Sequence, residues 1–238
     1  MTTDAPRASS RRLVVVGPSA RALVRLCGRF IASCIARGVH VQALAPEGSA
    51  SDAESLVGFG AQVGVLPQGP KGFTLFRARK ASRAFADQLH AFHPDAVLVF
   101  GTQIAPVAVA ASRRAGVKRI ALLVNELPFD GAAKKLKLAV KAASVVIAYN
   151  DADARTLATS LGAAEIVSVP GSGVDLSQPL GIPMPVDGEP IVFMAADRLD
   201  RAKGIHDYLE AARIAVERGV PARFLLAGPE GVEAGSIK

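Results

Sequence analysis

Short apolar runs alternate with longer segments of helical periodicity along most of the chain. The runs are four to six residues long and rich in Val, Ile and Leu, as is typical of buried strands. We expect strands at residues 13–16, 39–44, 62–65, 96–99, 119–124, 145–149 and 166–169. We expect helices between them at residues 20–37, 53–60, 75–92, 104–115, 132–142 and 152–161. This alternation predicts an α/β domain with a mainly parallel, Rossmann-like sheet.

A segment rich in glycine and proline interrupts the alternation. Gly171 and Gly173 begin it and suit a hinge with positive φ, and four prolines follow before residue 191. A second series then starts, with a strand at 191–194, a helix at 205–218 and a strand at 223–227. Because one β-α-β unit cannot bury a core of its own, we expect the second lobe to be incomplete.

The predicted layout has four parts. They are a disordered tail at 1–12, a complete Rossmann-like domain at 13–170, a hinge at 171–190 and a partial second domain at 191–238.

The net charge of +7 is unevenly distributed along the chain. Residues 1–141 hold 20 Lys/Arg against 8 Asp/Glu, whereas residues 142–238 hold 8 against 13. A basic lobe fits an anionic membrane surface or a phosphate-bearing acceptor, and a merely solubilising surface is the alternative.

Aromatic residues make up only 5% of the chain and no nucleic-acid motif is present, so we expect no nucleic-acid partner. No apolar run reaches the roughly 18 residues of a membrane span and no signal peptide precedes the first strand, so we expect a cytoplasmic protein.

The basic segment at 132–142, AAKKLKLAVKA, contains four lysines around an apolar stripe of Leu136 and Val140. One interpretation is an amphipathic helix that lies on the anionic inner face of a membrane. The other is an ordinary surface helix whose stripe faces the sheet. The sequence leaves both open.

Cys27 and Cys34 lie seven residues apart on one predicted helix. This spacing puts the thiols on one face but about 10 Å apart along the axis, which is too far for a disulfide. We expect two buried free thiols and no metal site.

Asp151 and Asp153 form a D-x-D pattern of the kind that binds a metal in some enzymes. The pattern here begins a predicted helix, in the segment NDADARTLA. We therefore interpret these acids as N-terminal caps and partners of the helix dipole.

The most informative chemistry lies in the turn after the strand at 191–194. This turn carries Arg198 and Lys203, and a helix is predicted just beyond Gly204. Two permanent cations beside a helix N-terminus suit a diphosphate, because the helix supplies unpaired N–H groups and the positive end of its dipole. A solvated basic turn is the alternative.

Three motifs in order give the chain a family resemblance. They are VPGSGVD at 169–175, ADRLDRAKGIHDYLEAAR at 195–213 and ARFLLAGPEG at 222–231. Together they resemble the retaining glycosyltransferases of family 4, whose members show a P-N-G-V-D hinge, a G-R-L-x-x-x-K-G loop and a strand ending in G-x-G-P. The resemblance implies the two-lobed GT-B architecture. It also implies a sugar transfer that needs no metal, from a UDP- or GDP-linked sugar to a saccharide or lipid-linked acceptor in cell-surface polysaccharide synthesis.

Carried onto this sequence, the resemblance implies three groups of site residues. Arg198 and Lys203 would act in catalysis by stabilising the departing diphosphate. The donor diphosphate would be bound by Arg198, Lys203, Gly204 and Gly17. The hinge and cleft would include Gly171, Gly173, Asp175, Asn125, Glu126 and Gly228.

Several departures from the family pattern limit this reading. The loop after the first strand keeps only Gly17 of a glycine pair, and Asn125-Glu126 follows a strand where many members carry a histidine. The family's acidic E-x7-E motif would lie beyond Gly231. We therefore expect a truncated enzyme, or one that a second polypeptide completes, and the alternative is a catalytically inert remnant or binding subunit. A dehydrogenase ranks last because no G-x-G-x-x-G follows the first strand.

Overall fold

The computed structural model divides the chain into two compact units, Met1–Val174 and Asp175–Lys238. It describes residues 11–66, 75–125, 133–163, 165–173 and 188–230. The division falls inside the 171–190 segment that the sequence marks as a hinge.

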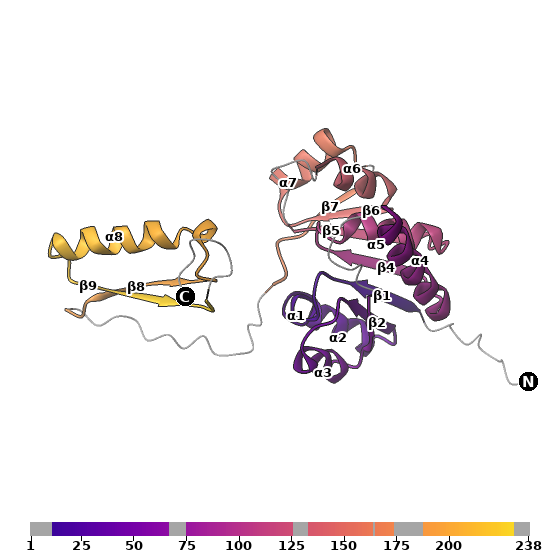
Figure 1. Cartoon of the computed structure of the whole chain (residues 1–238), viewed down its shortest axis with the longest axis horizontal. Coiled ribbons are helices and arrows are strands. Elements are labelled where there is room, and N and C mark those ends of the chain that lie inside the picture. The colour runs from indigo at the N-terminus through magenta and orange to yellow at the C-terminus, as the bar shows by residue number, and fades with distance from the viewer. Residues whose placement is uncertain (1–10, 67–74, 126–132, 164, 174–187, 231–238) are drawn as a thin grey trace, which may run out of the picture. The chain divides into compact units, whose positions relative to one another are not determined.

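The first unit is built on a seven-stranded sheet in the order β3-β2-β1-β4-β5-β6-β7, and all six neighbouring pairs are parallel (Figure 1). The strands are β1 (Arg12–Val16), β2 (His40–Ala45), β3 (Gln62–Val65), β4 (Ala96–Phe100), β5 (Arg119–Val124), β6 (Val145–Ala148) and β7 (Ile166–Ser168). The α/β fold class and the Rossmann-like parallel sheet expected from the sequence are therefore confirmed.

Helices connect successive strands of this sheet. They are α1 (Ala20–Ala22), η1 (Leu23–Cys27), α2 (Gly28–Ala36), α3 (Ala50–Gly58), α4 (Leu75–Phe92), α5 (Ala105–Arg114), α6 (Ala133–Ala142), α7 (Asp151–Thr156) and η2 (Leu157–Leu161). The helix expected at 53–60 begins earlier, at Ala50, because the side chain of Ser49 accepts a hydrogen bond from the N–H of Asp52 and caps it.

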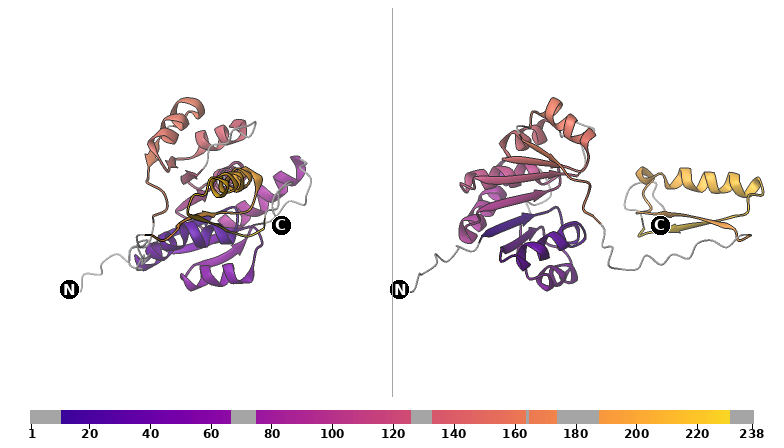
Figure 2. Two further views of the ribbon diagram at one scale, coloured as in Figure 1. Left: turned by 90° about the vertical axis from the view of Figure 1, so that its left-hand side faces the viewer. Right: turned by 180° about the vertical axis from the view of Figure 1, so that it is seen from behind.

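Both faces of the sheet are covered, and the pleat of each strand divides its residues between two cores. Val14 and Val16 of β1 pack with α4, α5 and α6, whereas Val15 packs with the helices between residues 20 and 58. The views in Figure 2 show helices on both sides of this sheet. A sheet buried on both faces explains why its strands read as continuous apolar runs.

The second unit contains β8 (Ile191–Ala196), α8 (Ile205–Glu217) and β9 (Ala222–Ala227), with a short helical turn, η3 (Arg201–Lys203), before α8. The two strands pair in parallel, and α8 covers one face of the pair (Figure 1). The hydroxyl oxygen of Tyr208 lies 3.1 Å from the carbonyl oxygen of Phe193 and 2.8 Å from that of Leu225, so it bridges helix and sheet. Side chains of β8 remain largely exposed, including Ile191 and Met194.

Both cysteines carry free thiols, as the sequence predicts. Cys27 is buried, and burial raises the pKa of its thiol to about 12. Cys34 is only partly buried, which corrects the expectation of two fully buried thiols.

Candidate functional site

The turn that follows β8 has the strand–turn–helix form that its sequence predicts. β8 ends at Ala196, η3 spans Arg201–Lys203 and α8 begins at Ile205. Gly204 joins η3 to α8 with a φ of 73°, in the left-handed region that favours glycine. Arg198, Lys203 and the first N–H groups of α8 therefore lie within one short segment.

The turn is fastened to the end of β9 by its backbone. The N–H of Asp197 donates to the carbonyl of Ala227 at 3.1 Å, and the N–H of Leu199 donates to the carbonyl of Pro229 at 3.1 Å. A Cβ atom on Gly228 would lie 1.7 Å from the carbonyl oxygen of Asp197. Glycine is therefore required at 228, because any side chain there would prevent the two loops from approaching this closely. That Gly228 belongs to a cleft stays a prediction.

Arg198 and Lys203 each face an aspartate, and neither aspartate was expected from the sequence. Arg198 Nη2 lies 3.1 Å from Asp200 Oδ2, and Lys203 Nζ lies 3.1 Å from Asp197 Oδ2. The N–H of Arg198 also donates to Asp197 Oδ1 at 2.7 Å. This backbone hydrogen bond and then the bond from Lys203 hold the pKa of the Asp197 carboxyl below its usual value.

A hollow of about 410 Å³ lies beside the first turn of α8. It is lined by Arg201, His206 and Asp207. Arg201 adds a third cation near the helix N-terminus, whereas Asp207 adds an acid to its first turn. The turn and the first turn of α8 therefore carry three cations and three acids, so their formal charges balance.

The carboxyl ends of three neighbouring strands meet in the first unit. A Cβ atom on Gly101, after β4, would lie 3.6 Å from Pro18 Cδ and 3.7 Å from Asn125 Oδ1. Asn125 follows β5 directly and is exposed. Ligands of open α/β sheets bind at this edge, so Asn125 stands where a cleft residue is expected. Gly101 was missed, although its position after a buried strand was a usable signal.

Gly17 follows β1 at the same edge. Its N–H donates to the carbonyl of Leu44 at 3.0 Å, and a Cβ atom at this position would lie 2.5 Å from Leu23 Cδ2. The glycine is therefore required for packing against the following helical segment, whatever it binds.

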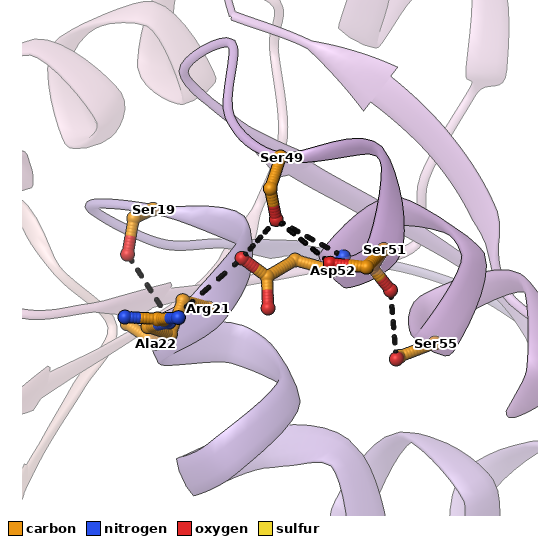
Figure 3. A network of polar contacts seen from close by, with 7 residues as sticks. All are labelled: Ser19, Arg21, Ala22, Ser49, Ser51, Asp52 and Ser55. Carbon is orange, nitrogen blue, oxygen red and sulfur yellow. Dashed lines mark hydrogen bonds and ion pairs between the residues drawn. The ribbon is translucent and has the colours of Figure 1, made fainter.

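A polar network joins the loops after β1 and β2 (Figure 3). Ser49 donates to Asp52 Oδ2 at 2.6 Å, and Arg21 Nε lies 4.0 Å from the same oxygen. Ser19 accepts a hydrogen bond from the N–H of Ala22 at 3.1 Å and so caps the first helix. The network holds the starts of two helices at the carboxyl edge of the sheet.

Gly171 and Gly173 have φ values of 71° and 76°, as hinge glycines would. The segment from Val169 to Ser172 is tied to the first unit. The N–H of Val169 donates to the carbonyl of Ala148, and Ser172, between the two glycines, contacts Tyr149 through their hydroxyl oxygens at 2.7 Å. Asp175 and Glu126, the other two predicted cleft residues, lie outside the described residues.

Asp151 and Asp153 lie in the first turn of α7, where they face the positive end of the helix dipole. The cap itself is Asn150, whose side chain accepts from the N–H of Asp153 at 2.8 Å. The dipole interpretation is thus confirmed, and the capping role belongs to the preceding residue. In the described part of the chain, no three His, Cys, Asp or Glu side chains are grouped as metal ligands.

The apolar stripe of α6 packs against the sheet. Leu136 and Val140 are buried in the core of the first unit, so the interpretation of this stripe as a membrane-facing surface is wrong. Lys134, Lys137 and Lys141 remain exposed beside it. Among the described residues, none of the helices combines the length and apolarity that a bilayer span requires.

The parallel sheet and the second β-α-β unit define a Rossmann-like α/β protein of the GT-B kind. The model of the glycosyl transferase 4-like domain matches residues 21–171, which is more than half of the chain. The chain therefore belongs to this family of glycosyltransferases. No curated protein compared with the chain gives a significant match.

Solved structures share the fold. The lipopolysaccharide outer core galactosyltransferase WaaB matches with a TM-score of 0.64 at 15% identity, over 92% of this chain and 68% of that one. A glycosyltransferase from Rickettsia africae matches with 0.66 at 16% identity, over 92% and 61%. A UDP-GlcNAc 2-epimerase from Neisseria meningitidis bound to UDP-GlcNAc matches with 0.62 at 13% identity, over 91% and 65%. The chain thus spans about two thirds of the length of these proteins.

Proposed function

We propose that the chain takes part in moving a sugar from a nucleotide-linked donor to a saccharide or lipid-linked acceptor in cell-surface polysaccharide synthesis. The turn that carries Arg198 and Lys203 at the start of α8 is the observation on which this proposal rests. Membership of the glycosyltransferase family supports it. Two solved structures of similar fold are described with UDP-GlcNAc or UDP, which supports a uridine nucleotide, with GDP as the alternative.

The proposed chemistry is electrostatic. Cleavage of the sugar–phosphate bond leaves negative charge on the diphosphate, and in this proposal Arg198, Lys203 and the N–H groups at the start of α8 stabilise that charge. These groups supply the positive charge that a metal would otherwise provide. We therefore propose a metal-independent transfer, and the family resemblance extends the proposal to retention of configuration.

The test is UDP binding by titration calorimetry. We expect Arg198→Ala to weaken UDP binding by about tenfold or more, because a charge-assisted bond to phosphate is lost. The matched control is Arg218→Ala, at the opposite end of α8, roughly 20 Å along the helix. Equal UDP affinities for the wild-type chain and Arg198→Ala would show that UDP does not bind at this turn.

A binding subunit that a second polypeptide completes is the other candidate. It is favoured by the exposed apolar side chains of β8, because an isolated two-stranded sheet is marginal in water. In that case the chain alone would bind UDP weakly through the basic turn, and it would bind UDP more tightly once the second polypeptide is added.

A further inference from the structure

The two aspartates of the basic turn hold their cations in different environments. Asp197 has a side chain that is 48% exposed, whereas Asp200 is fully buried at 0%. The distance from carboxylate to cation is 3.1 Å in both pairs. Burial therefore distinguishes the two pairs, and burial decides how easily an ion pair separates.

Asp197 uses both of its oxygens within the turn. Oδ1 accepts the N–H of Arg198 and Oδ2 pairs with the ammonium of Lys203. A backbone N–H together with a cationic side chain is also the combination that binds a phosphate oxygen. The carboxylate thus occupies the position of an anionic ligand. Because the pair is exposed it is weak, and a diphosphate of higher charge can displace it.

Asp200 behaves differently because its carboxylate is buried. Taking a cation away from a buried carboxylate costs more than separating two exposed groups, so Arg198 stays anchored to Asp200. A guanidinium carries five N–H donors, and the Arg198 side chain is half exposed, so it can hold a second anion while it remains paired.

We propose that Asp197 is an internal competitor of the donor diphosphate. It holds Lys203 while the site is empty and gives way when a diphosphate binds, whereas Asp200 stays paired and positions Arg198. This inference rests on the diphosphate site proposed above. It makes Asp197 the residue that weakens donor and product affinity and so favours release of the nucleotide.

The test compares the same substitution at both aspartates. Asp197→Asn keeps an oxygen that can accept the Arg198 N–H but removes the charge that competes for Lys203. In calorimetric titrations of the full chain with inorganic pyrophosphate and with UDP, we expect Asp197→Asn to bind about two- to fivefold more tightly than the wild type. We expect Asp200→Asn to bind at least about fivefold more weakly. Damage to the fold would weaken binding, so a gain in affinity has no merely structural explanation.

Two controls make the result specific. In a Lys203→Ala background the gain from Asp197→Asn should disappear, because no ammonium remains to be released. Thermal unfolding of each variant shows whether Asp200→Asn is folded. If it is not, the affinity of Asp197→Asn alone decides the test, because position 197 is exposed.

Three outcomes are decisive. Tighter binding by Asp197→Asn that requires Lys203 supports the competitor role. If the wild type binds pyrophosphate and Arg198→Ala does not, but Asp197→Asn binds no more tightly than the wild type, the competitor role is overturned and the diphosphate site stands. If neither the wild type nor Asp197→Asn binds pyrophosphate, the diphosphate site and the inference both fall.

Discussion

The first strand of each unit has a similar apolar sequence but a very different environment. In β1, Val14, Val15 and Val16 are all 0% exposed, because helices cover both faces of a seven-stranded sheet. In β8, Ile191 is 59% exposed and Met194 is 63% exposed, in a sheet of two strands. The buried core of the described chain therefore lies almost entirely in the first unit, whereas the charged candidates Arg198 and Lys203 lie in the second.

The largest effect should come from truncating a buried side chain in the first unit. Leu122 of β5 is fully buried, so Leu122→Ala should lower the free energy of unfolding by about 2–5 kcal/mol. Met194→Ala in β8 should change the free energy of unfolding by less than about 0.5 kcal/mol, because the Met194 side chain is already largely in water. Urea unfolding of both variants measures the contrast, and equal losses would show that β8 is covered in solution.

Alkaline pH should destabilise the first unit through Cys27. Burial raises the pKa of this thiol from 9.0 in the open chain to about 12 in the fold. The stabilising effect of the neutral thiol is therefore complete below pH 9 and is lost as the pH rises from 9 towards 12. The loss should reach about 2 kcal/mol near pH 10.5. Cys27→Ala lacks this titration, so the difference between the two unfolding curves across pH isolates it, and parallel curves would contradict the buried thiol.

A side chain at Gly228 should damage the basic turn. Its Cβ atom would meet the carbonyl oxygen of Asp197, so Gly228→Ala must push the two loops apart. We expect UDP affinity to fall by about tenfold, an effect of about 1.4 kcal/mol. The matched control is Gly58→Ala in the first unit, where a Cβ atom meets nothing within 4 Å and UDP affinity should not change. An unchanged UDP affinity in Gly228→Ala would show that UDP binds elsewhere than at this turn.

The smallest effect concerns the lysines of α6. Their apolar neighbours are buried, so only exposed charge is left to attract an anionic surface, at about 1 kcal/mol per residue. Replacing Lys134 alone by Gln should weaken binding to phosphatidylglycerol vesicles in cosedimentation at low salt by about fivefold. Phosphatidylcholine vesicles serve as the control, and equal binding by variant and wild type would exclude α6 as a membrane contact.

The fold was predictable to a large extent because periodicity reports burial directly. Each of the seven strands of the first unit appeared as an apolar run, and the structure moves most of their ends by only a residue or two. The orientation of α6 could not be read in the same way. A stripe of Leu136 and Val140 looks alike whether a sheet or a bilayer covers it, and only tertiary packing decides.

The sequence predicts two cations of the candidate site but neither their aspartate partners nor the third cation, Arg201. Arg198 and Lys203 stand out by type and position, whereas Asp197 and Asp200 read as ordinary turn residues. One signal was available, because Asp197 stands where the family pattern G-R-L-x-x-x-K-G begins with glycine. The burial of Asp200 had no sequence signal, since it depends on how the turn folds against the end of β9.

The turn from Asp197 to Gly204 is the proposed binding site for the diphosphate of a nucleotide. The most direct measurement is an amide NMR titration of the full chain with UDP. We expect the largest shifts at Arg198, Lys203 and Gly204, with smaller shifts at Gly228, and Arg198→Ala should need at least about tenfold more UDP to show them at Lys203 and Gly204. Shifts confined to the seven-stranded unit, or equal shifts in Arg198→Ala at the same UDP concentration, would contradict binding at this turn.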